Sequence, residues 1–521
     1  MRGNRGAASM KTTGSSLSLV RRTTARKAVS PNPDVVAGVD LGSNSFHMIV
    51  GRVVDGHLDV VDRIREGVRL ASGLDEKGMI TAGARDRALA CLERFGQRLR
   101  DMRPEHIRAV GTNTFRKARR ARSFVRECEA ALGHPIEVLS GAEEARLIYL
   151  GVAHDLSDDA GRRLVVDIGG GSTECIVGEH FEPLEAHSLY MGCVGYSERF
   201  FSGGKLKERA FEKARIAARL ELRTIERRYR ALGWEECRGS SGTIAHVNAL
   251  LRENGWSRDG INAKGLKKLV RALVSAGSLE ALELEGLDPS RLEVLPGGVA
   301  ILQAVVEALD IERMRVSSGA LREGLLYDLL GRIRHEDVRD LTIRRLCERY
   351  HVETEHAARV ERTALRCLEQ TAAKWGLAEP ESQQLLSWAS RLHEIGLSIA
   401  YTGYHKHSAY IVAHSNMPGF SVEDQQQLAS LILAHRRKIP PAVLASDAAV
   451  RLELCVLLRL AVCLNRNRSP HPRGTFALAV RPRGLEIRFA SGWLDEHPLT
   501  RADLEQEAER LATVGFELRV N

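Results

Sequence analysis

The sequence predicts an α/β protein with two similar domains, followed by an all-helical domain and a small α+β C-terminal tail. A strand, a glycine-containing turn and a second strand occur twice, at 36–50 (VAGVDLGSNSFHMIV) and at 164–177 (LVVDIGGGSTECIV). Two distant copies of one pattern indicate two similar domains that face each other. Beyond Gly331 the apolar residues recur at helical spacing. We therefore expect domains at 34–160, 161–330, 331–475 and 476–521.

The first 33 residues predict a disordered basic tail. They hold seven Lys or Arg and no acid, and they lack hydrophobic periodicity. An organelle transit peptide has a similar composition, and a start at Met10 is another alternative. The remaining chain carries 69 basic and 67 acidic residues. The net charge of +9 therefore gives no reason to expect specific nucleic-acid binding.

Composition argues against several other classes of protein. Aromatic residues are only 5% of the 521, too few for the stacking platforms of single-strand binders. The nine cysteines form no C-x-x-C pair, which favours reduced thiols over zinc sites or disulfides. No apolar run is expected to span a bilayer, because the strongest one, Leu452–Leu464, contains Arg459. A cytoplasmic protein is the expectation, and peripheral membrane contact stays open.

The first domain is expected to place a turn and two helix starts at one site. Its first hairpin turns at Gly42, Ser43, Asn44 and Ser45, directly after Asp40. A strand at 107–110 runs into a basic helix expected at 115–128, and a phosphate bound at its start would lie one turn from Arg116. A strand at 136–139 precedes a helix whose first turn holds Glu143 and Glu144. A well-capped helix without further function is the alternative for this segment.

The second domain carries the stronger candidate for a phosphate loop. Successive amides without side-chain cover make an anion-binding concavity, and hydroxyl groups add donors. Asp167, Glu174 and the matching Asp40 supply hard oxygens suited to Mg²⁺ or another divalent cation. A glycine-rich hairpin without a ligand is the alternative reading of one such turn. The predicted loop residues are Gly169, Gly170, Gly171, Ser172 and Thr173, and a further helix start directed at the cleft is Ser241, Gly242 and Thr243.

Later segments complete the prediction. A long charged helix is expected at Glu208–Leu232, and the turn at 318–324 is expected to close the site. Helices are expected at 344–375 and 381–397, and strands at 476–480 and 485–489. The segment 391–396 resembles the helix of HD-type phosphohydrolases, but Glu394 replaces the aspartate that those enzymes need beside His393. We expect an HD-like fold without a working metal site, and basic patches at 404–407 and 435–438 that bind a phosphate chain or simply face solvent.

Five motifs in order carry a family resemblance. DLGSNSFHMIV, SGAEEARLIYLGV, DIGGGSTE, GSSGTI and SSGALREGLLYDLL together resemble the exopolyphosphatase and guanosine pentaphosphate phosphatase family. The two hairpins also resemble the phosphate loops of the actin and sugar kinase superfamily. The resemblance implies two actin-like (ribonuclease H-like) ATPase-type domains. It further implies that Glu144 activates the attacking water and that Arg116 contacts the phosphate.

The resemblance implies a cytoplasmic, Mg²⁺-dependent homodimer that hydrolyses the terminal phosphate of linear polyphosphate. Gly171 and the junction Gly331-Arg332-x-Arg334-His335 resemble the exopolyphosphatase branch. Hydrolysis of guanosine pentaphosphate, with the same chemistry and a different leaving group, is the nearest alternative. An actin-like ATPase or sugar kinase and a non-catalytic nucleotide sensor are the remaining ones.

Overall fold

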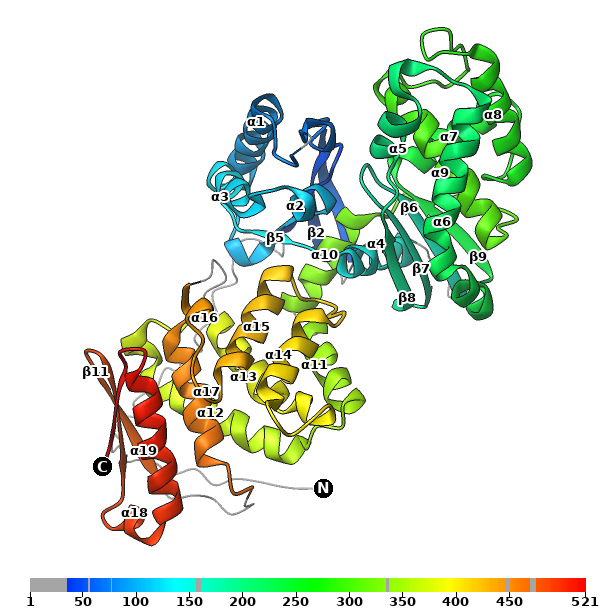
Figure 1. The fold of residues 1–521 in the computed structure, drawn as a ribbon. Coiled ribbons are helices and arrows are strands. Elements are labelled where there is room, and N and C mark those ends of the chain that lie inside the picture. Colours follow the sequence, from blue (N-terminus) through cyan, green and yellow to red (C-terminus); the bar gives the residue numbers. More distant parts are fainter. Residues whose placement is uncertain are drawn as a thin grey trace, which may run out of the picture.

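The computed structural model describes residues 35–54, 57–75, 77–155, 161–333, 337–445, 450–468 and 475–521. Figure 1 shows two α/β units side by side, with a helical unit below the first and the C-terminal strands at its far end. The basic tail predicted at 1–33 lies outside the described residues, as do Arg334 and His335 of the predicted junction.

The first unit is built on a five-stranded sheet with the order β3-β2-β1-β4-β5. Strands β1, β2 and β3 form an antiparallel meander, whereas β4 and β5 run parallel to β1. The apolar faces of α1 and α3 bury leucine and phenylalanine side chains against one side of this sheet. The elements are β1 (Val35–Leu41), β2 (Phe46–Val54), β3 (His57–Glu66), α1 (Ala82–Leu99), β4 (Ile107–Gly111), α2 (Asn113–Lys117), α3 (Ala121–Leu132) and β5 (Ile136–Val138).

The second unit repeats this topology, with the order β8-β7-β6-β9-β10. Again the first three strands are antiparallel and the last two run parallel to the central strand, so the repeat in the sequence is a repeat of fold. Its elements are β6 (Arg162–Ile168), β7 (Thr173–Glu179), β8 (Glu182–Leu189), α5 (Cys193–Phe200), α6 (Glu208–Leu232), β9 (Glu236–Ser240), α7 (Gly242–Glu253), α8 (Ala263–Ala276), α9 (Leu295–Leu309) and β10 (Arg315–Val316).

Two helices cross between the sheets, α4 (Gly141–Asp155) and α10 (Leu321–Ile333) (Figure 1). Helix α4 follows the first sheet but packs on β7 and β8, and α10 follows the second sheet but packs on β1 and β2. Glycines allow the crossing to be close, because a Cβ on Gly324 would collide with the carbonyl of Leu147. Each unit thus depends on a helix that leaves the other.

The helical domain and the C-terminal tail share one continuous apolar core. A small sheet, β11-β12-β13, lies at the end of this domain and includes a last strand that the sequence pattern did not reveal. The elements are α11 (Val338–Arg349), α12 (Thr354–Trp375), α13 (Pro380–Leu392), α14 (Tyr404–His414), α15 (Val422–Ala434), α16 (Pro441–Ala445), α17 (Leu452–Leu464), β11 (Phe476–Arg481), β12 (Gly484–Phe489), α18 (Trp493–Glu496), α19 (Pro498–Ala512) and β13 (Glu517–Val520).

Several expectations from the sequence were wrong. The helix expected at 344–375 is interrupted, because α11 ends at Arg349 and α12 begins at Thr354. The basic helix expected at 115–128 is divided into α2 and α3, because Arg120 adopts the left-handed conformation at φ 59° and the rings of Phe115 and Phe124 stack at 5.5 Å. The segment Pro289–Leu309 is also long and apolar enough to cross a membrane, but 72% of its strongest window is buried inside the protein. Packing in the core of the second unit accounts for its composition. The nine cysteines all lie in the described part of the chain, where they are buried and form no disulfide.

Candidate active site between the two sheets

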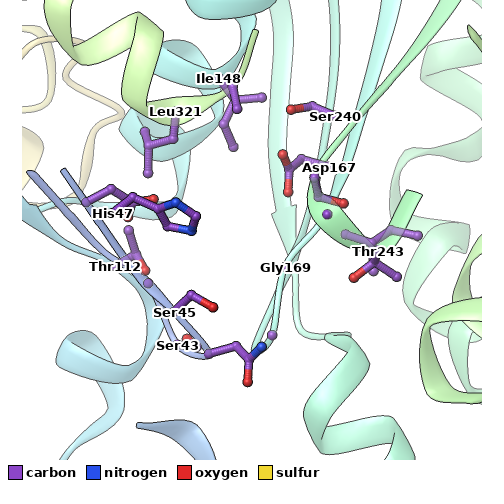
Figure 2. Close-up of a pocket in the computed structure, with 18 of the residues that line it drawn as sticks. Ser43, Ser45, His47, Thr112, Ile148, Asp167, Gly169, Ser240, Thr243 and Leu321 are labelled. Carbon is purple, nitrogen blue, oxygen red and sulfur yellow. The ribbon is translucent and has the colours of Figure 1, made fainter. Parts of the chain in front are cut away.

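A cavity of about 630 Å³ opens between the two α/β units. Figure 2 shows Ser43 and Ser45 of the first unit on one wall, opposite Asp167 and Gly169 of the second. The predicted loops at 42–45 and 169–172 both line it, as does Glu144. The fold therefore gathers into one cleft residues that the sequence places about 130 positions apart.

The two predicted phosphate loops touch each other. A Cβ placed on Gly170 would lie 3.2 Å from the Cβ of Ser43, and one on Gly171 would lie 2.6 Å from Oδ1 of Asn113. Only glycine leaves this space open at position 171, since a side chain there would displace Asn113. Thr114 in turn donates to Oγ of Ser43 at 2.8 Å.

Main-chain bonds hold the carbonyl groups of both loops. The N–H of Ala71 donates to the carbonyl of Ser43 at 2.8 Å, and that of Val194 donates to the carbonyl of Gly170 at 3.0 Å. A similar bond of 2.9 Å joins Cys193 to Gly169. Each carbonyl oxygen that accepts such a bond is turned toward its donor, so that its partial negative charge is compensated and repels a bound phosphate less. The two loops therefore suit an anion.

Three carboxylates converge where the strands enter the loops. Burial, followed by repulsion from Glu144, raises the pKa of Asp40 to about 8. Burial raises the pKa of Asp167 to about 6, and burial with repulsion from Glu144 raises that of Glu174 well above its usual range. Oδ1 of Asp40 is buried and has no hydrogen-bond partner among the described residues. A divalent cation would supply that partner and relieve the repulsion, so this set of hard oxygens fits the predicted Mg²⁺.

Glu144 faces the cavity and is held from behind by Arg116. Nη1 of Arg116 donates to Oε2 of Glu144 at 2.8 Å and to the carbonyl of Leu139 at 2.8 Å. Glu144 is 7% exposed and lines the cavity, whereas Arg116 is not among the lining residues. The structure therefore places Arg116 as a partner of Glu144 rather than at the cavity surface.

The remaining predicted residues divide into two groups. Ser241, Gly242 and Thr243 line the cleft, and the hydroxyl of Ser241 caps α7 by accepting from the N–H of Ile244 at 3.4 Å. Thr173 lies outside the lining and donates its hydroxyl to the carbonyl of Met191 at 2.6 Å. The reason is strand alternation, because Glu174 points into the cleft and its neighbour in β7 must point away.

The cleft also contains one histidine and several arginines that the sequence did not indicate as site residues. Burial and the charges of Arg322, Arg65 and Arg291 lower the pKa of His47 to about 3, so its imidazole is neutral at physiological pH. Arg65 reaches Oγ of Ser45 at 3.5 Å. The i, i+2 spacing of Arg63 and Arg65 in β3 was the available signal. No pattern in the sequence indicated Arg291, because this residue lies in the turn Pro289–Val294 and reaches the cleft only through tertiary packing.

The helical domain contains a histidine cluster with one member that the sequence analysis missed. His356 of α12 joins His393 and Glu394, and their ligand atoms lie within 4.8 Å of one another. Nε2 of His393 is buried and has no hydrogen-bond partner within the described ranges. Arg468, however, donates to both oxygens of Glu394, at 2.8 and 2.7 Å. Because this guanidinium already balances the carboxylate, we assign no metal role to the cluster.

The duplicated sheets and the cleft between them define an actin-like ATPase fold with a site built for phosphate groups. Residues 49–333 match the Ppx/GppA phosphatase family, and residues 338–508 match Ppx/GppA phosphatase, domain III. The chain belongs to the Ppx/GppA phosphatase family and is a phosphohydrolase of that family.

Two relatives and two solved structures illustrate this membership. The guanosine-5'-triphosphate,3'-diphosphate pyrophosphatase of Aeromonas hydrophila is 40% identical over 495 residues, covering 94% of this chain and 99% of the relative. That of Vibrio vulnificus is 40% identical over 489 residues, covering 94% and 98%. An exopolyphosphatase-like protein aligns with TM-score 0.52 at 26% identity, over 57% of this chain and 99% of its own. The exopolyphosphatase of Cytophaga hutchinsonii shares the fold, with TM-score 0.52 at 24% identity over 57% and 97%.

Proposed function

We propose that the protein hydrolyses the terminal phosphate of guanosine 5'-triphosphate 3'-diphosphate. The observation that carries the chemistry is the convergence of two bare-backbone loops, a carboxylate cluster and Glu144 in one cleft. The substrate is favoured by relatives of that name, which are 40% identical to nearly the whole chain. This preference reverses the order expected from the sequence, where polyphosphate came first.

Linear polyphosphate is the second candidate substrate. It ends in the same phosphoanhydride group, so the two loops would bind it in the same way. The third glycine of the second loop, Gly171, resembles the exopolyphosphatase branch and favours this candidate. Because Gly171 has no side chain, its backbone lies close to Asn113, and this supports a loop that fits tightly around a small terminal phosphate.

In the proposed reaction, the loops at 42–45 and 169–172 bind the terminal phosphate. Glu144 accepts a proton from a water molecule whose oxygen attacks the phosphorus, while the anhydride bond breaks and the nucleotide leaves with the bridging oxygen. Arg116 fixes the direction of the Glu144 carboxylate. Asp40, Asp167 and Glu174 would hold Mg²⁺, which neutralises phosphate charge when bound.

Phosphate release from both substrates, with Mg²⁺, tests this proposal. We expect the wild-type protein to prefer the guanosine nucleotide in kcat/KM, and Glu144→Gln to lower kcat by about 10² to 10⁴, the usual contribution of a general base. Glu182→Gln, at an exposed ion pair with Arg345, is the matched control and should change neither. A folded Glu144→Gln variant with near wild-type turnover would refute the role of Glu144. A higher kcat/KM for polyphosphate would reverse the substrate assignment.

A further inference from the structure

Two consecutive glutamates in the first turn of α4 face different parts of the protein. Glu144 lines the cleft, whereas the side chain of Glu143 is fully buried on the side of the helical domain. Successive residues of an α-helix lie about 100° apart, so one turn can present both faces at once. A displacement of the backbone at Glu143 therefore also moves Glu144, its neighbour in the same turn.

Glu143 belongs to a buried ion network between α4 and α10. Arg146 donates to both of its oxygens at 2.8 Å and also pairs with Asp328. Arg108 reaches Asp328 at 2.6 Å from β4. Two buried carboxylates thus meet two buried guanidinium groups, which compensates their charge and gives each a defined geometry.

Among the residues that the structure describes, the helical domain joins this network through Gly419. Its N–H donates to Oε2 of Glu143 at 2.8 Å, and its carbonyl accepts from Nη2 of Arg332 at 3.0 Å. Both backbone polar groups of Gly419 are therefore held by the first two units. The residue has φ +90°, and a Cβ on it would lie 2.8 Å from Cγ of Arg339, so only glycine suits this position.

The loop around Gly419 is firmly attached to the helical domain. Met417 and Phe420 are buried in its apolar core, and Thr342 donates to the carbonyl of Pro418 at 2.8 Å. Because this rigid loop is hydrogen-bonded to Glu143, the position of the helical domain constrains the position of the first turn of α4.

We propose that Glu143 is a positioning residue through which the helical domain holds Glu144 in its reactive place. The proposal rests on the role proposed above for Glu144. A misplacement of about 1 Å at a reacting group lowers turnover by about 100-fold, so loss of this grip is expected to act on kcat. The helical domain then contributes to catalysis although it adds no group to the cleft lining.

A double-mutant cycle tests the proposal. We expect Glu143→Gln to lower kcat by about 10- to 100-fold while KM changes less than about threefold. In a Glu144→Gln background the same substitution should have no further effect, because the positioned group is gone. Glu236→Gln is the matched control: it removes a carboxylate that pairs with the buried Arg163 in the second sheet, away from Gly419 and Arg332, and it should stay within about twofold of wild-type kcat.

The cycle separates this proposal from the previous one. An equal loss from Glu143→Gln in both backgrounds would overturn the positioning role, whereas an unimpaired Glu144→Gln variant would overturn the general base. If Glu143→Gln fails to fold, Arg332→Gln replaces it in the cycle, because this substitution removes the hydrogen bond to the carbonyl of Gly419. The same dependence on Glu144 is expected. Thermal unfolding of each variant identifies losses due to instability.

Discussion

Mg²⁺ binding to the carboxylate cluster should tighten as the pH rises. Because the pKa is about 8 for Asp40 and about 6 for Asp167, Asp40 is about nine-tenths protonated at pH 7 and Asp167 about one-tenth. A bound cation requires the charged carboxylates, so it must displace about one proton from this pair, in addition to any on Glu174. The apparent dissociation constant should therefore fall about tenfold from pH 6.5 to 7.5.

Isothermal titration with Mg²⁺ in buffers of different ionisation enthalpy measures the released proton directly. At pH 7 the heat should change with the buffer as expected for release of at least about one proton per ion. Asp40→Asn removes the larger contributor of the pair and should lower the proton count to that of Asp167 and Glu174. Binding that is independent of pH, with heats that do not depend on the buffer, would show that the carboxylates are not the ligands or are already charged.

Three further predictions follow from the same cleft. Without a divalent cation, the contribution of Asp40 and Asp167 to the free energy of unfolding should fall as the pH rises from about 4 to about 8, because the folded state keeps protons on both groups that the unfolded state has released. Thermal unfolding of the wild-type protein and of Asp40→Asn across that range checks this, since the stability of the wild type relative to the variant should decrease as the pH rises. Gly171→Ala places a Cβ 2.6 Å from Oδ1 of Asn113 and should lower kcat/KM for phosphate release by at least about tenfold, whereas Gly67→Ala, which enters open space, should not. Arg116→Met leaves Glu144 without its fixed partner and should reduce kcat by about 10- to 100-fold, and unchanged turnover would contradict an orienting role.

The local elements of the site were predictable because short-range rules govern them. Both hairpins occur where an apolar run, an aspartate and a glycine turn follow each other, and α6 spans Glu208–Leu232 as its apolar spacing predicted. The division of the helix expected at 115–128 was not predictable, since it depends on how Phe115 and Phe124 pack. The edge strand β8 was not predicted. Most of its residues are exposed or half-buried, so its sequence lacks the apolar run that marks a buried strand.

Residue direction was harder to predict than residue position. The loop motif includes Thr173, but the pleat of β7 turns this hydroxyl toward Met191. In the sequence Glu143 is only a residue in the first turn of a helix, yet it joins α4 to the helical domain through Gly419. Both outcomes depend on contacts between segments that the sequence does not order.

The sequence by itself determined that two glycine-containing turns with adjacent carboxylates would form, because turns and strands depend on neighbouring residues. Only the tertiary structure decided which charges share the cleft. Arg65 and Arg291 come from separate units, and each reaches the site through packing of elements distant along the chain. Burial and Coulombic interactions both depend on distances in space, so the pKa values of Asp40 and His47 became defined only when the two sheets met.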